Sequence, residues 1–181
     1  MQLRRFLLVG AVMLAGAASW AADQRGAEQS KKVVSTHIVA PGNASTDGEA
    51  IGNVQVIYED GTKDLWTTKG NCSLPKAAPD STVGWTVHGN PVHINSGDPI
   101  RPNPELVVCR QGKVLARIQA SLPFIEDWHF LAEGKQVALR CRGGHGPANI
   151  ELHDTATGKL VTTLKAYDEK LPAWAKPLRD E

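Results

Sequence analysis

An acidic residue and a histidine share one face of a strand-like run, and this pattern comes nearest to acid–base chemistry in the chain. Asp127 and His129 lie two residues apart in the run Glu126–Ala132, so the two-residue period of a strand places both side chains on one face. A carboxylate beside an imidazole would hold the tautomer of the ring and raise its pKa. The alternative is structural, a cross-strand salt bridge or a hydrogen-bonded histidine, because no nucleophile motif accompanies the pair.

Three further histidines fall in segments that read as loops. His88 and His93 stand five residues apart in a proline-bearing loop, and His145 lies in the glycine-rich stretch Gly143–Pro147. Neutral imidazole nitrogens bind transition metals, but this spacing matches no recognised ligand motif. We therefore expect neither a metal nor another cofactor. These histidines either contact a ligand or form ordinary polar surface.

Arginine, glycine and tryptophan supply the other candidate contacts. Arg140 and Arg142 share one strand face, where they could bind an anion or remain solvated. The Gly143–Pro147 stretch lacks the strand-loop-helix context of a phosphate loop.

Tryptophans are expected to pack between sheets, but one near a loop would anchor a partner, and we assign that role to Trp85. The predicted binding residues are His88, His93, His145, Trp85 and Arg142.

Strands must position these residues. The stretch from Ile125 to Leu164 contains four strand-like runs joined by glycine-bearing turns, which predicts one antiparallel four-stranded sheet. Earlier, Asp60-Gly61 between two β-rich runs is a strong hairpin signal. The fold class is therefore all-β. The four runs are Glu126–Ala132, Gln136–Cys141, Ala148–His153 and Lys159–Leu164, and the earlier runs are Val33–Val39, Gly52–Tyr58, Lys63–Thr68, Thr82–His88, Glu105–Cys109 and Lys113–Gln119.

The first residues read as an export signal. Arg4 and Arg5 precede an apolar run from Phe6 to Ala18 that is too short for a comfortable membrane span, and small residues precede a predicted cleavage after Ala21. A retained single-helix anchor is the alternative. We predict a periplasmic or secreted protein with a signal peptide at 1–21, a flexible arm at 22–32, a β domain at 33–165 and a C-terminal extension at 166–181.

The chain that follows the signal is nearly neutral. The whole sequence has a formal charge of +1, and residues 1–21 contain two arginines and no acid, so residues 22–181 carry 1 − 2 = −1. Without a dense basic patch, this composition does not suit nucleic-acid binding. The length suits one domain with a substantial core.

Glycine turns recur at nearly equal intervals. Gly61, Gly112 and Gly158 stand 51 and 46 residues apart, close to the roughly 40–50 residues of a propeller blade. Aligning the units makes Val33–Val39 a second strand, and the hairpin at Gly61 supplies the third and fourth. Leu74–His88 then forms a short first strand and a second strand of the next unit.

Three stretches share a strand-turn-strand pattern, namely Ala78-Pro79-Asp80 before Val83-Gly84-Trp85, Phe130–Lys135 before Gln136–Leu139, and Ile150–Asp154 before Thr157-Gly158-Lys159. This pattern resembles that of the TolB-type and WD-repeat propellers, broadly the exported PD-repeat proteins, over roughly residues 50–165. The resemblance implies antiparallel four-stranded blade-like sheets stacked as a partial β-propeller of about two and a half to three blades. Because propellers typically close with more blades, the shortage implies a homodimer that completes a ring, an open stack or a compact sandwich.

In a blade arrangement, the second-to-third strand loops and the connections between blades emerge at one end of the sheets. Cys109 would lie toward the opposite end. Cys72–Cys141 is then the preferred disulfide after export, with Cys109 a buried thiol. Three unpaired thiols are the alternative, because no spacing enforces a bridge. The residues gathered at the first end would be His37, Cys72, His88, His93, Cys141 and His145.

The leading functional hypothesis is an exported binding or scaffold protein without enzymatic activity. Large loops on rigid sheets supply shape for recognising a protein or envelope ligand without reactive groups. The alternative is a small periplasmic enzyme or metal-binding protein that uses Asp127, His129 and His145. A degenerate relative of a longer propeller is a third interpretation.

Overall fold

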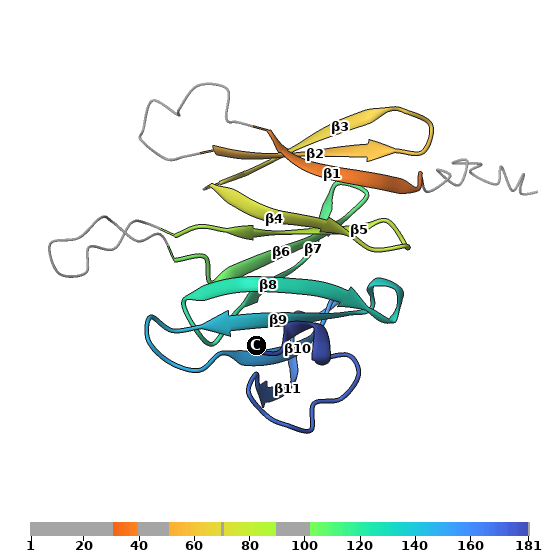
Figure 1. Cartoon of the computed structure of the whole chain (residues 1–181). Coiled ribbons are helices and arrows are strands. Elements are labelled where there is room, and N and C mark those ends of the chain that lie inside the picture. The colour runs from red at the N-terminus through yellow and green to blue at the C-terminus, as the bar shows by residue number, and fades with distance from the viewer. Residues whose placement is uncertain (1–30, 40–50, 70, 90–101, 181) are drawn as a thin grey trace, which may run out of the picture.

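The computed structural model describes residues 31–39, 51–69, 71–89 and 102–180. Within them the chain forms eleven strands and two short 3-10 turns, arranged as three antiparallel sheets in which the strands follow sequence order. The sheets lie one on another, with the first at the top of Figure 1 and the third at the bottom. The all-β class predicted from the sequence is confirmed. None of the described segments forms a helix long and apolar enough to cross a membrane.

The first sheet has three strands, β1 (Val33–Val39), β2 (Ile51–Tyr58) and β3 (Lys63–Lys69). The hairpin between β2 and β3 turns as predicted, with Gly61 at a φ of +79°. Asp60 Oδ1 accepts a hydrogen bond of 2.9 Å from the backbone N–H of Thr62, which closes the turn. Val54 and Val56 alternate with half-buried neighbours and face the second sheet.

The second sheet has four strands, β4 (Cys72–Ala77), β5 (Thr82–Val87), β6 (Glu105–Arg110) and β7 (Lys113–Gln119). Every residue of β5 is buried, because a neighbouring sheet covers each of its faces. A break of register in β4 leaves Leu74 at a φ of +50°, which is uncommon for a residue other than glycine. The Leu74 carbonyl accepts a hydrogen bond of 3.0 Å from Trp128 Nε1 of the third sheet.

The third sheet has four strands, β8 (Phe124–Leu131), β9 (Gln136–Arg142), β10 (Asn149–Asp154) and β11 (Leu160–Lys165). These are the four strands that the sequence predicts between Ile125 and Leu164. The turn η1 (Ala132–Gly134) joins β8 to β9. Gly134 has a φ of +92°, and a side chain there would collide with the carboxylate of Asp80 from the second sheet. The turns of the two sheets therefore pack directly on each other.

Two apolar cores hold the three sheets together. Between the first and second sheets, Val56 packs with Trp85 and Val107. Between the second and third, Trp128 is fully buried and its ring lies over Gly84, where a Cβ atom would be only 2.8 Å from it. Burying each large apolar side chain stabilises the fold by roughly 1.5–3 kcal/mol.

Residues Ala166–Asp180, termed the terminal cover, lie over the outer face of the third sheet. Leu171 and Leu178 are buried there against Ile150 of β10, and Trp174 packs on the same cluster. The cover contains the turn η2 (Lys176–Leu178).

The strands alternate in direction, so their connections divide between two ends of the stack (Figure 1). The short hairpins at 59–62, 78–81, 111–112, 132–135 and 155–159 lie at one end, termed the turn end. Strands β1, β3, β5, β7 and β9 end at the other, termed the loop end. Of the connections that leave from these strand ends, those at 40–50 and 88–104 are the longest in the sequence.

Candidate functional site

His88 stands at the loop end, just after β5, where its ring meets a pair of hydroxyl groups. His88 Nε2 lies 2.9 Å from Ser73 Oγ, and Ser73 Oγ lies 2.7 Å from Thr86 Oγ1. The backbone N–H of His88 donates to the Asn71 carbonyl at 2.8 Å. The register of β4 and β5 pairs Ser73 with Thr86, which sets the hydroxyls side by side. Neither hydroxyl carried a signal in the sequence.

The donors in this group follow from the geometry. Thr86 Oγ1 donates to the Ser73 carbonyl at 3.1 Å, so the Ser73 hydroxyl donates to Thr86 and accepts from His88 Nε2. The other ring nitrogen, Nδ1, is buried without a hydrogen-bond partner in the described part of the chain. An unpaired acceptor nitrogen at this position costs less free energy than a buried N–H group without an acceptor. His88 therefore donates to Ser73 and does not act as the base of a nucleophile pair.

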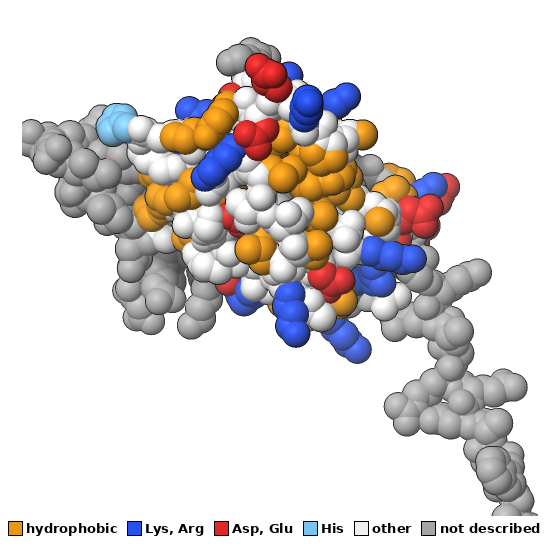
Figure 2. All heavy atoms as spheres, turned by 90° about the horizontal axis from the view of Figure 1, so that it is seen from below, with side chains coloured by type: hydrophobic (Ala, Val, Ile, Leu, Met, Phe, Trp, Pro, Cys, Tyr) orange, Lys and Arg blue, Asp and Glu red, His pale blue; other side chains and the backbone are white. Residues whose placement is uncertain are grey.

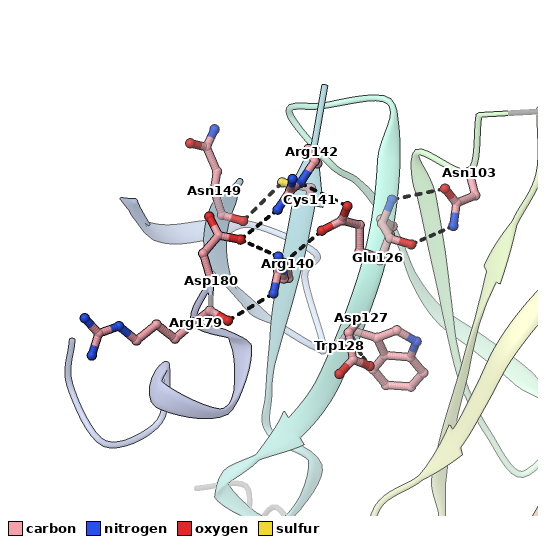
Figure 3. Close-up of polar contacts among 11 residues, drawn as sticks. Asn103, Glu126, Asp127, Trp128, Arg140, Cys141, Arg142, Asn149, Arg179 and Asp180 are labelled. Atoms are coloured by element: carbon pink, nitrogen blue, oxygen red, sulfur yellow. Dashed lines mark hydrogen bonds and ion pairs between the residues drawn. The ribbon is translucent and has the colours of Figure 1, made fainter. Parts of the chain in front are cut away.

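Arg142 belongs to a network of charges that fastens the terminal cover to the third sheet (Figure 3). Arg142 Nη2 donates to Asp180 Oδ1 at 2.7 Å, and Arg140 contacts the same carboxylate. Glu126 lies 2.9 Å from Arg140 Nε and 3.0 Å from Arg142 Nε, but neither N–H group is directed at it, so these contacts are ionic. Two arginines face two carboxylates, so the network offers no surplus positive charge to an anionic ligand.

Asp127 and His129 lie on one face of β8, as predicted, but each is bonded to a different partner. Asp127 Oδ1 accepts from Lys76 Nζ at 2.5 Å, whereas His129 Nε2 contacts the Trp174 carbonyl at 3.1 Å. Burial would raise the pKa of Asp127, but hydrogen bonds from Lys76 and the Trp128 backbone lower it. Burial also lowers the pKa of His129, against the effect of the Trp174 carbonyl. The expected rise in the histidine pKa is wrong, and the geometry matches the structural alternative.

A buried polar cluster between the second and third sheets was not anticipated from the sequence. Glu151 on β10 is 1% exposed, and its carboxylate accepts hydrogen bonds of 3.1 Å from the Ser121 backbone N–H and from Cys141 Sγ, and another from the Ser121 hydroxyl. His153 Nε2 lies 3.1 Å from the second carboxylate oxygen, while its Nδ1 lies 3.2 Å from the Gly158 carbonyl. Each ring nitrogen thus faces an oxygen atom.

The chemistry of this cluster is structural. Burial would raise the pKa of Glu151, but hydrogen bonds from His153, Ser121 and Cys141 lower it to about 2. Burial and the neighbouring Glu151 raise the pKa of the Cys141 thiol to about 12, so this thiol does not supply a nucleophilic thiolate. The alternation of Glu151 and His153 in one strand was the signal that could have found the pair.

The three cysteines are free thiols. Cys72 packs on the core between the first and second sheets, whereas Cys141 is buried in the core between the second and third. The second sheet separates them, so the Cys72–Cys141 bridge preferred from the sequence is not formed. Cys109 is buried near the end of β6, toward the turn end as expected. Burial raises the pKa of its thiol to about 11.

The predicted binding residues divide between surface and interior. Trp85 is 2% exposed and its ring centroid lies 6.1 Å from that of Trp66, so it packs between sheets and does not face a partner. His145 is exposed in the connection from β9 to β10, at the loop end. His88 lies at the same end, and His93 falls outside the described residues. Arg142 ends β9 and is committed to its ion pairs.

Neither a metal site nor a known relative guides the assignment further. In the described segments, no group of three His, Cys, Asp or Glu side chains is placed to hold a metal ion. No protein-family model matches the sequence, and no similar curated protein was found. The geometry of the sheets and their two ends is therefore the basis on which a function is assigned.

Proposed function

We propose that the protein is exported and binds a protein or another component of the cell envelope through its loop end, without catalysing a reaction. The observation that carries this proposal is the position of the strand ends: those joined by the longest connections in the sequence lie at the loop end, whereas short hairpins join the strands at the turn end. Loops held by a rigid scaffold commonly supply recognition surfaces. His88 and His145 are the candidate contacts at this end.

The turn end supports the proposal as a rigid base. Ser81 Oγ accepts a hydrogen bond of 3.0 Å from the Val33 backbone N–H, which joins the second sheet to the first. Within the third sheet, Thr155 Oγ1 donates to the Gly134 carbonyl at 2.6 Å. The contact of Gly134 with Asp80 joins that turn to the second sheet. These contacts fix the strands from which the loops depart.

We infer that the stack is a partial propeller, in line with the resemblance found in the sequence. The strands β4 and β8 run in the same direction at the same edge of their sheets, whereas β1 runs the opposite way (Figure 1). In direction, β1 corresponds to β5 and β9, the second strands of the other two sheets. By strand direction alone, the first sheet matches a unit without its first strand.

We further propose that one copy of the chain forms the whole stack. The homodimer expected to complete a ring would need the outer face of the third sheet, on which the next sheet would pack. The terminal cover occupies that face, where it buries Leu171, Ala175 and Leu178. Figure 2 shows this side of the molecule, where apolar side chains gather in patches bordered by charged ones.

Site-specific photo-crosslinking in the cells that produce the protein tests the binding proposal. A crosslinking amino acid at His145, at the loop end, is compared with one at Glu133, which is exposed at the turn end. We expect a discrete crosslinked product from position 145 and none from position 133. Equal products from both positions, or a product from position 133 alone, would contradict the proposal.

A further inference from the structure

The second sheet is covered unequally on its two faces. The core that it shares with the first sheet draws on β4, β5 and β6 but on no residue of β7. The core that it shares with the third sheet includes Ala116 and Ile118 of β7. The register places Val114 and Arg117 opposite Cys109 and Val107, on the side of the first sheet, and both are exposed, with Val114 at 53%.

No strand of the first sheet lies over this surface among the described residues, because β1 packs against β4 and the first sheet has one strand fewer than the second. The second and third sheets have four strands, whereas the first has three in the described residues and ends at β3. Trp66 of β3 reaches toward the turn between β6 and β7, where its Nε1 lies 4.0 Å from the position of a Cβ on Gly112. The edge of β3 that pairs with no described strand therefore lies beside the uncovered face of β7.

We propose that an extended segment of a partner protein binds along β3 as the fourth strand of the first sheet. The free edge of β3 presents backbone N–H and C=O groups that an extended segment can pair with, as in β-strand addition. A strand in this position would also cover Val114. This surface runs along β3 and differs from the loop-end contacts proposed above.

The side chains of β3 define the sequence that would bind. Lys63 and Leu65 pair with Ile57 and Gln55 on the outer face, whereas Asp64 and Trp66 face the second sheet. Opposite charges directly across a ladder attract, so in an antiparallel arrangement we expect an acidic residue opposite Lys63 and a basic one opposite Asp64. We expect apolar residues opposite Leu65 and Trp66. The partner segment then reads apolar-apolar-basic-acidic toward its C-terminus, which lies at the turn end.

The probe is a synthetic peptide, Thr-Val-Thr-Val-Val-Lys-Glu, acetylated and amidated at its ends. The matched control peptide exchanges the last two residues to Glu-Lys, which sets like charges opposite Asp64 and Lys63. Binding is followed by backbone amide NMR shifts of the full protein. We expect saturable shifts confined to β3 and β7, and a control peptide that binds about fivefold more weakly, since two charge pairs are reversed.

Two protein variants separate this site from a general affinity for apolar peptides. Val114→Asp should weaken binding of the probe at least about fivefold, because it places a charge under the added strand. Leu160→Asp changes a residue of similar exposure, 54%, on β11 and should leave binding unchanged. Equal affinities of the two peptides, shifts centred on β11, or equal losses in the two variants would overturn the proposal. So would protection of β3 amides that rises with protein concentration, because a second copy would then fill the edge.

Discussion

Glu151 is a carboxylate in the interior of the fold, where a charge without hydrogen-bond donors would strongly lower the stability. A carboxylate at 1% exposure is stable only when donors surround it. Ser121, Cys141 and His153 supply these donors from three different places in the sequence. The cluster lies between the second and third sheets. Its hydrogen bonds link β10 to the connection before β8 and so help to fix the register of β10.

Replacing Glu151 by glutamine should destabilise the protein by roughly 3 kcal/mol, because His153 loses its charged partner and the amide NH2 group meets other donors. The free energy of unfolding from urea titrations at pH 7 measures this effect. Glu59→Gln, at an exposed position, serves as the control and should change stability by less than about 0.5 kcal/mol. Equal effects of the two substitutions would show that the buried cluster is not a significant source of stability.

The pH dependence of stability should identify the same carboxylate. The pKa of Glu151 is about 2 in the folded protein against 4.5 for the ordinary group, so the folded state binds its proton less readily than the unfolded state. The stability contributed by this group is complete above pH 4.5 and is lost as the pH falls toward 2. We expect the difference in unfolding free energy between wild type and Glu151→Gln to stay constant from pH 7 to about 5 and then to shrink. A constant difference down to pH 2.5 would contradict the assignment.

At the scale of elements, the packing of β8 on β5 requires a glycine at position 84. Gly84 lies in the middle of β5, and the ring of Trp128 occupies the space in front of it. The ring is held there by its hydrogen bond to the Leu74 carbonyl and lies edge-on to Phe130, with centroids 5.1 Å apart. The indole therefore has little freedom to move away.

Gly84→Ala should cost about 2 kcal/mol of stability, because the new methyl group would lie 2.8 Å from the Trp128 ring. Thermal and urea unfolding measure the loss. Gly144→Ala is the matched control, since nothing lies within 4 Å of a Cβ at that position, and its stability should stay within about 0.5 kcal/mol of wild type. A neutral Gly84→Ala would show that the two sheets are less closely packed than the structure has them.

The strands could be predicted from the sequence, but their partners across the sheets could not. Local signals, such as the Asp60-Gly61 turn and the alternation of Val54 and Val56, determine where β2 and β3 lie. By contrast, the side of the second sheet to which Cys72 or Trp85 turns depends on how β4 and β5 pair with distant strands. For this reason the disulfide and the tryptophan anchor were predicted wrongly, while the sheet that contains them was outlined correctly.

At the scale of the whole molecule, the terminal cover occupies the outer face of the third sheet. The place of the cover on the third sheet depends on contacts between residues that are far apart in the sequence. Asp180 meets Arg140 and Arg142 of β9, and Leu178 meets the core beside β10. A stack of sheets needs a polar or covered outer face at each end to remain soluble. The cover provides this at the third sheet.

The mass of the purified protein in solution tests most directly the claim that one copy forms the whole stack, with the outer face of the third sheet covered by its own chain. Light scattering coupled to size-exclusion chromatography, over a wide range of protein concentrations, should give the mass of one chain throughout. Cooperative urea unfolding with a midpoint that does not depend on protein concentration should accompany it. A stable dimer, with a midpoint that rises with protein concentration, would contradict the account and favour a ring completed by two copies.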